Sequence, residues 1–116
     1  TNKMTGRIGD SPIIGSGTYA DNDSVAVSCT GTGDIYMRVN AAHEVSALYK
    51  YKTSDVQKAA EEAVKEVAAL GGSGGIISID KFGKTGFAWT KDKLGMYHGE
   101  ARLGAKPVVY WPLGEK

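Results

Sequence analysis

Two short clusters in this 116-residue chain have residue types and a spacing that suit the binding of a small polar ligand. The first is residues 6–12 (GRIGDSP), where Arg7 and Asp10 stand among two glycines and a proline that disfavour a helix. A guanidinium binds a carboxylate through two parallel hydrogen bonds, and a carboxylate accepts from an ammonium. The head of a free amino acid carries both groups side by side. The alternative is a surface ion pair between Arg7 and Asp10, worth about 0–1 kcal/mol.

The second cluster is residues 29–34 (CTGTGD), a glycine-rich turn. It follows the alternating segment 24–28 and precedes a helical pattern that starts at Ile35. A turn between a strand and a helix leaves backbone N–H groups unpaired near the positive end of the helix dipole. An anion or a developing oxyanion can be held there, although such turns also occur for steric reasons alone.

Both clusters, with the sequence that connects them, resemble the β-subunit of plant-type L-asparaginases. These enzymes are also called isoaspartyl peptidases and belong to the N-terminal nucleophile hydrolases. The segments that carry the resemblance are 6–12, 15–21 (GSGTYAD), 26–34 (AVSCTGTGD), 70–77 (LGGSGGII) and 95–97 (GMY). The resemblance covers most of the chain and is most specific over residues 1–34.

The resemblance implies hydrolysis of L-asparagine and β-aspartyl (isoaspartyl) dipeptides. In that family a threonine freed by self-cleavage attacks the side-chain carbonyl, and its own α-amine acts as the base. The hydroxyl of Thr30 and the N–H of Gly31 then form the oxyanion hole. Arg7 holds the substrate α-carboxylate, Asp10 its α-ammonium, and Gly33 lines the same pocket. No metal and no cofactor are implied.

The nucleophile itself does not match this chain. Thr1 carries an amine beside a hydroxyl, but residues 1–4 (TNKM) resemble the family's loop that leads into the Arg–Asp segment. We therefore expect residues 1–116 to be a partial domain that lacks the N-terminal nucleophile strand and is inactive alone, with Thr1 as nucleophile the lesser alternative. The expected partners are the α-subunit of the same precursor and a second αβ unit, giving an (αβ)2 heterotetramer.

Two other functions stay open from the sequence. Glycosylasparaginase activity is one, because residues 33–35 (GDI) followed by 37–38 (MR) fit that branch, whereas 1–3 (TNK) fit the asparaginase branch better. A non-catalytic amino-acid-binding module is the other, because the nucleophile is missing. The segment after Trp89 departs from the asparaginase pattern and leaves the leaving group undefined.

Composition excludes several classes of function. Fourteen Lys and Arg against thirteen Asp and Glu give a net charge of +1, which indicates neither a nucleic-acid partner nor an anionic membrane. No apolar run approaches the roughly 20 residues that span a bilayer. The single cysteine, Cys29, excludes an internal disulfide, and with only two histidines a structural zinc site is not expected. We expect a cytoplasmic protein, with Cys29 buried and with His43 and His98 in surface or packing roles.

Alternating apolar residues and turn residues predict two hairpins and one further strand. The hairpins are 13–20 with 25–30 around the turn 21–23, and 75–80 with 84–89 around 81–83. Residues 108–111 (VVYW) predict an edge strand closed by Pro112. Trp89 and Trp111 end strand patterns and are expected to pack in a core or an interface.

Two helices are predicted between the hairpins. One runs from Ile35 to Tyr49, and the other begins with the capping-box spacing of Ser54 and Gln57. Residues 71–75 (GGSGG) lack the Lys-Ser/Thr of a phosphate loop, so we interpret them as a helix stop and a close backbone approach. These elements predict an α+β fold. The resemblance sharpens this to part of a four-layer αββα sandwich, completed by a missing strand and an α-subunit.

Overall fold

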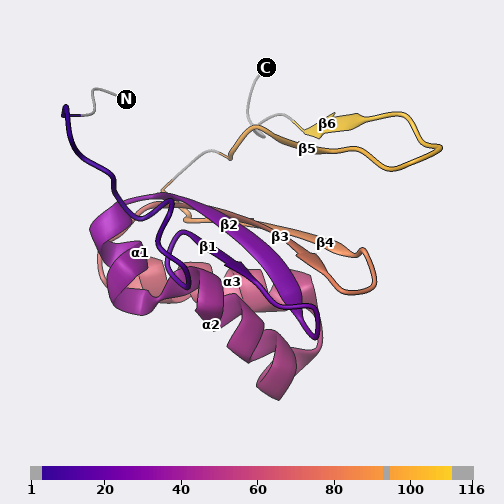
Figure 1. Ribbon diagram of the computed structural model, residues 1–116, viewed down its shortest axis with the longest axis horizontal. Helices are drawn as coiled ribbons and strands as arrows, with labels where there is room; N and C mark the ends of the chain where they lie inside the picture. The colour runs from indigo at the N-terminus through magenta and orange to yellow at the C-terminus, as the bar shows by residue number, and fades with distance from the viewer. Residues whose placement is uncertain (1–3, 93–94, 111–116) are drawn as a thin grey trace.

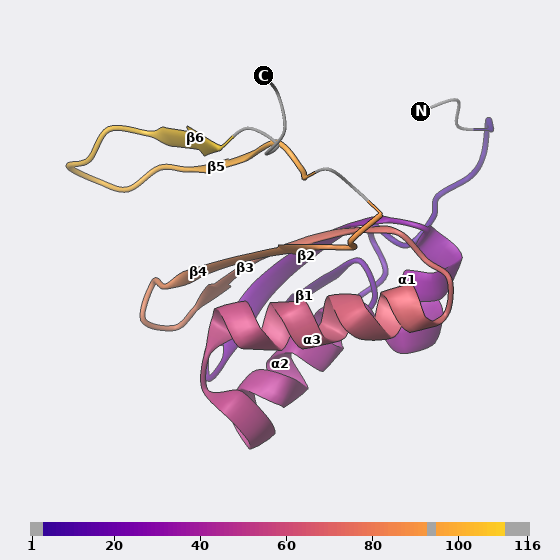
Figure 2. The same ribbon diagram turned by 180° about the vertical axis from the view of Figure 1, so that it is seen from behind.

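The computed structural model describes residues 4–92 and 95–110. These form a four-stranded antiparallel sheet with the order β1-β2-β3-β4 and a separate two-stranded hairpin, β5-β6. In both views the three α-helices cover one face of the large sheet and the β5-β6 hairpin lies over the other (Figures 1 and 2). The predicted α+β class is confirmed, and the structure supplies a helix layer and two sheet layers of the αββα sandwich.

The first hairpin joins β1 (Thr18–Ala20) to β2 (Val25–Gly31), with Tyr19 opposite Val27. The predicted strand 13–20 is wrong over residues 13–17. Those residues form turns instead, because the N–H groups of Ile13 and Ser16 bond carbonyls three residues earlier in the chain rather than a neighbouring strand. The long strand β2 runs through Gly31 and α1 begins at Gly33, so the predicted glycine-rich turn 29–34 is reduced to Thr32 between them.

The second hairpin joins β3 (Gly74–Asp80) to β4 (Thr85–Trp89), close to the predicted bounds. Side chains alternate between the faces of the sheet. Those facing the helices are buried and form the core with them: Val25, Val27, Cys29, Ile76 and Ala88. On the opposite face, Ile77 and Ile79 remain 52% and 43% exposed.

The helix predicted from Ile35 to Tyr49 is broken in two. The structure has α1 (Gly33–Val39) and α2 (Ala41–Leu48), separated by Asn40 in the left-handed region at φ 56°. The break is stabilised by tertiary hydrogen bonds, since the N–H groups of Ala42 and His43 bond the carbonyls of Ser16 (3.0 Å) and Gly15 (2.8 Å). A helical periodicity carries no information about such partners. One π-helical turn, Tyr49–Thr53, follows α2.

Helix α3 (Val56–Ala69) begins one residue later than the capping-box spacing predicts. Asp55, not Ser54, is the N-cap, and its carboxylate accepts from two backbone N–H groups of the first turn. The helix ends where the sequence predicts, because Gly71 adopts φ 80° and its N–H bonds the carbonyl of Ala68. Its inner face is fully apolar: Val56, Ala59, Ala60, Ala63, Val64 and Val67.

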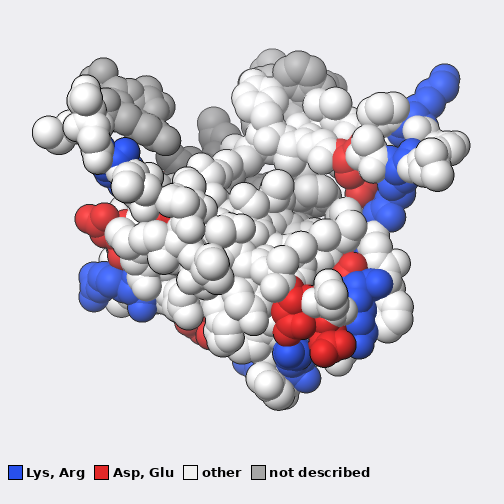
Figure 3. Space-filling model, viewed as in Figure 1, with Lys and Arg blue, Asp and Glu red and all other residues white. Residues whose placement is uncertain are grey.

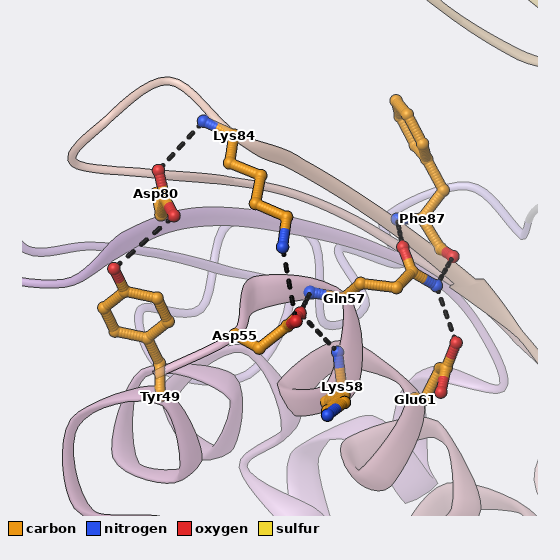
Figure 4. Close-up of polar contacts among 8 residues, drawn as sticks. All are labelled: Tyr49, Asp55, Gln57, Lys58, Glu61, Asp80, Lys84 and Phe87. Carbon is orange, nitrogen blue, oxygen red and sulfur yellow. Dashed lines mark hydrogen bonds and ion pairs between the residues drawn. The ribbon is translucent and has the colours of Figure 1, made fainter. Parts of the chain in front are cut away.

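The start of α3 is tied to the second hairpin by the polar contacts in Figure 4. The side-chain amide of Gln57 donates to the carbonyl of Phe87 (2.8 Å) and accepts from its N–H (2.9 Å), as a neighbouring strand would. Lys84 pairs with Asp55 at 3.2 Å. The helix layer is therefore held in register with strand β4.

The β5-β6 hairpin consists of β5 (His98–Glu100) and β6 (Val108–Tyr110). The predicted edge strand is confirmed over 108–110, whereas Trp111 and Pro112 lie outside the described residues. The sequence analysis did not predict β5. The first residue of β5, His98, has a packing role, as expected. Its ring centroid lies 4.5 Å from that of Phe87, 5.4 Å from that of Trp89 and 4.8 Å from that of Tyr110.

On the face shown in Figure 3, acidic and basic side chains lie together in small groups near the margins, with a large uncharged area between these groups. Among the described residues, no helix has the length and apolar character needed to cross a membrane.

Candidate functional site

Arg7 and Asp10 lie on an irregular loop, as the glycines predict. Gly6 and Gly9 adopt φ 85° and 76°, values that L side chains rarely take. The Arg7 guanidinium folds over Gly9, because a Cβ on that glycine would lie 2.9 Å from Nη1 of Arg7. Among the ion pairs of the described residues none joins Arg7 to Asp10, so the structure does not support the surface-pair alternative.

Asp10 is a buried carboxylate that lacks a full set of partners. Its residue is only 6% exposed, and its Oδ2 has no hydrogen-bond partner among the described residues. Leaving such an oxygen unpaired costs about 1–3 kcal/mol, and more for a charged group. A ligand that donates a hydrogen bond would satisfy it.

Gly33 lies directly against this pair. A Cβ built on Gly33 would lie 2.7 Å from Oδ1 of Asp10 and 3.2 Å from Nη2 of Arg7. The structure therefore brings three of the predicted site residues together, from a loop near the N-terminal end and from the start of α1 (Figure 1). The absence of a side chain at Gly33 lets the Asp10 carboxylate and the Arg7 guanidinium approach its Cα closely.

The other two predicted residues, Thr30 and Gly31, end strand β2 beside this group. The connection runs through Gly17, where a Cβ would overlap the carbonyl oxygen of Asp10 and whose own carbonyl accepts from the N–H of Cys29 at 2.9 Å. Thr30 follows Cys29 in the strand. The two sequence clusters therefore share one end of the sheet.

Cys29 is packed rather than reactive. Burial raises the pKa of its thiol to about 12, with a further contribution from the negative charge of Asp10. Burial also raises the pKa of Tyr36, and the charges of Cys29 and Asp10 add to that shift. A thiol of this kind stays protonated at neutral pH and is a poor nucleophile.

Thr30 and Gly31 face an open cavity of about 350 Å³. Both residues are exposed, so a substrate carbonyl can reach them. Thr32, Ser73, Gly74 and Met96 complete its lining. Arg7, Asp10 and Gly33 are not part of this lining.

The sequence analysis did not assign a role to Thr32, Ser73 or Tyr36, which surround Gly31. The glycine-rich segment 71–75 was the signal that a second backbone approaches there. The alternative nucleophile Thr1 lies outside the described residues. Within residues 4–92 and 95–110 no group of three or more His, Cys, Asp or Glu side chains is placed to hold a metal ion.

Most of this chain matches known proteins in sequence. The family described as asparaginase matches residues 1–106. The chain is 46% identical over 110 residues to the isoaspartyl peptidase of Escherichia coli (strain K12), and 45% identical over 110 residues to that of Salmonella typhimurium. It is 40% identical over 111 residues to the probable isoaspartyl peptidase/L-asparaginase 2 of Arabidopsis thaliana.

These alignments cover 94% or 95% of this chain but only 33% or 34% of each relative. The chain thus spans about a third of the length of the curated relatives it matches. The family match extends over most of the chain. The chain belongs to the asparaginase family.

Proposed function

We propose that the full-length protein hydrolyses the side-chain amide of L-asparagine and the β-aspartyl bond of isoaspartyl dipeptides. In this proposal Arg7 holds the α-carboxylate of the aspartyl head, and Oδ2 of Asp10 accepts from its α-ammonium. Gly33 gives the head group room. The residues described here supply binding and electrostatic stabilisation, and the nucleophile comes from a part of the protein that this chain does not span.

The chemistry follows the pattern of a threonine nucleophile whose own α-amine is the base. The threonine hydroxyl attacks the substrate carbonyl and passes its proton to that amine. The resulting oxyanion accepts hydrogen bonds from the Thr30 hydroxyl and the Gly31 N–H. The C–N bond then breaks as the leaving amine takes the proton, and water releases aspartate from the acyl-enzyme. One such oxyanion donor contributes about 2.7–4 kcal/mol to the barrier reduction.

A single observation supports the proposal most strongly. Asp10 is a buried carboxylate with an oxygen that has no partner among residues 4–92 and 95–110, and it lies beside a guanidinium and a glycine near the end of the strand that carries Thr30 and Gly31. This combination offers one acceptor and one cationic fork for a zwitterion, with backbone and hydroxyl donors next to them. The names of the relatives add weight to an aspartyl amide as the substrate.

The assembly is also a proposal. The outer face of the large sheet leaves Ile77 and Ile79 half exposed, as expected if strands from elsewhere in the precursor cover it. We place residues 1–116 as part of a β-subunit that pairs with an α-subunit released by self-cleavage, in an (αβ)2 enzyme of the cytoplasm. The buried free thiol of Cys29 fits a reducing compartment.

The test uses the full-length gene product. Its subunits are first checked by N-terminal sequencing, and ammonia or amino-acid release is then measured with L-asparagine, β-aspartyl dipeptides and glycosylasparagine. The proposal predicts cleavage before a threonine and turnover of the first two substrates. Turnover of glycosylasparagine alone would favour glycosylasparaginase, and aspartate binding by calorimetry without any turnover would favour an amino-acid-binding module. Either result would overturn the proposal.

A further inference from the structure

The glycine-rich turn 71–75 lies against the turn that carries the oxyanion donor. Gly31 and Gly74 are directly opposite in the β2–β3 pairing. A Cβ on Gly31 would overlap the carbonyl oxygen of Ser73, and one on Gly74 would overlap that of Thr30. The two backbones approach so closely that neither position has room for a side chain.

The direction of the Gly31 N–H follows from the pairing of the strands. The carbonyl of Gly74 accepts from the N–H of Thr90 (2.9 Å), and its N–H donates to the Thr90 hydroxyl (3.1 Å), so both groups face β4. In an antiparallel pair the opposite residue then turns its own N–H and carbonyl away from the shared boundary. Gly31 therefore faces the same way as Cys29, whose N–H reaches Gly17 in the N-terminal loop.

Thr32 stabilises this close approach of the two backbones through three hydrogen bonds to one residue, Ser73. Its N–H donates to the carbonyl of Ser73 at 2.8 Å. Its hydroxyl accepts from the N–H of Ser73 at 3.1 Å and lies 3.3 Å from the same carbonyl. Thr32 has no side-chain bond to the helix that follows it, so the hydroxyl is committed to the other turn.

Tyr36 packs against the same two glycines from the core side. It is fully buried, and its hydroxyl lies 3.4 Å from the carbonyl oxygen of Gly75. A Cβ on Gly31 would lie 2.9 Å from Cε2 of Tyr36, and one on Gly74 would lie 2.7 Å from its hydroxyl. The ring therefore fills the space on the core side of both glycines. Thr32 contacts the same pair of backbones from the exposed side.

We propose that Thr32 is a positioning residue for the oxyanion hole: its hydroxyl ties the turn 30–33 to Ser73 and so fixes the direction of the Gly31 N–H. The inference rests on the proposed function, because it assigns a role in the same reaction. In this proposal Thr32 is assigned no contact with the head group or with the attacking hydroxyl. Its effect is on the transition state, where a misplacement of about 1 Å lowers the rate about 100-fold.

The test compares Thr32→Val with Thr32→Ser in the processed full-length enzyme, with Thr32→Ala as a second variant should the valine protein fail to fold. Valine keeps the shape and the backbone bond but removes both hydroxyl contacts, whereas serine keeps them. We expect Thr32→Val to lower kcat about tenfold with little change in KM, and Thr32→Ser to retain the wild-type kcat within about twofold. An unchanged kcat, or a rise in KM alone, would overturn the inference.

A second measurement does not depend on turnover. Hydrogen–deuterium exchange read by mass spectrometry over residues 29–34 should be faster in Thr32→Val than in wild type and Thr32→Ser. If the wild-type enzyme turns over none of the substrates, the proposed function fails, and the exchange rates alone then decide whether Thr32 fixes this turn. Equal exchange in all three proteins would refute that role.

Discussion

Gly33 presents a bare Cα to the carboxylate of Asp10, with room for no more than a hydrogen: a Cβ there would lie 2.7 Å from Oδ1. The same Cβ would lie 3.2 Å from Nη2 of Arg7. One glycine therefore lets both charged groups pack against the start of α1. This contact joins the two clusters of the sequence, because Gly33 begins α1 two residues after Gly31 ends β2.

Substitution of Gly33 by alanine should push against both charged groups. We expect Gly33→Ala to raise KM for L-asparagine at least tenfold, because the methyl group displaces either the Asp10 carboxylate or the ligand. Asp34→Ala is the matched control, since it changes an exposed residue of the same turn. Steady-state kinetics of both variants test the point. Equal KM values for Gly33→Ala and wild type would show that the head group binds elsewhere.

Removal of the guanidinium should weaken substrate binding without stopping self-cleavage. In the full-length protein, Arg7→Ala should raise KM for L-asparagine at least tenfold, since a charge-assisted fork to a carboxylate is lost. Arg38→Ala, on the exposed side of α1, removes an arginine of equal charge and serves as control. Gel analysis of the subunits, run beside the kinetics, reports processing. Unaltered asparagine kinetics in Arg7→Ala would remove the role assigned to Arg7.

The buried carboxylate of Asp10 should cost the empty protein stability. Asp10→Asn keeps the shape but removes the charge whose Oδ2 has no partner among the described residues. We expect a higher thermal midpoint, equivalent to about 1 kcal/mol, together with a large rise in KM. Differential scanning calorimetry on the ligand-free enzyme measures the first effect, with Asp34→Asn as an exposed control. A lower midpoint for Asp10→Asn would indicate that the carboxylate is already satisfied.

The sequence predicts β2, β3, β4 and β6 and the two hairpins of the large sheet, because each of these has a local signal. Alternation defines β2 and β3, and the turn at Gly83 joins β3 to β4. The errors arise where distant residues decide. Asn40 breaks the predicted long helix because the loop at Gly15 and Ser16 supplies carbonyls to the next helix, a contact that no periodicity reveals.

The candidate site also has one part that the sequence predicts and one part that depends on distant residues. The types and spacing of Arg7 and Asp10, together with the resemblance, are enough to indicate an aspartyl head-group site. The hydrogen bonds between Thr32 and Ser73 beside Gly31 cannot be predicted from residue spacing. These two residues are 41 positions apart and meet only through the β2–β3 pairing. Glycines 71, 72, 74 and 75 indicate a close approach but not the segment that approaches.

Stability should fall in alkaline solution partly through Cys29. The folded thiol has its pKa raised to about 12, whereas an unfolded thiol ionises near about 8.5. Between these values the unfolded chain loses a proton that the folded protein keeps, so the free energy of unfolding decreases as pH rises. At pH 9.5 the loss is about 1 kcal/mol relative to pH 8.

Urea unfolding at pH 8, 9 and 9.5 measures this effect, with Cys29→Ala as the comparison. The alanine variant should show a shallower decrease, because Tyr36 and the lysines titrate in both proteins. Iodoacetamide labelling located by peptide mass spectrometry is an independent check, since the folded thiol should resist modification at pH 8.5. Equal pH slopes for the two proteins would contradict the raised pKa.

The most direct measurement of the central claim is a crystal structure of the processed full-length enzyme with L-aspartate, the reaction product. We expect the α-carboxylate on the guanidinium of Arg7 and the α-ammonium on Oδ2 of Asp10. We also expect a side-chain oxygen within hydrogen-bond distance of both the Gly31 N–H and the Thr30 hydroxyl. Aspartate bound at this end of the sheet without contacting Arg7 and Asp10, or bound only elsewhere, would contradict the central claim.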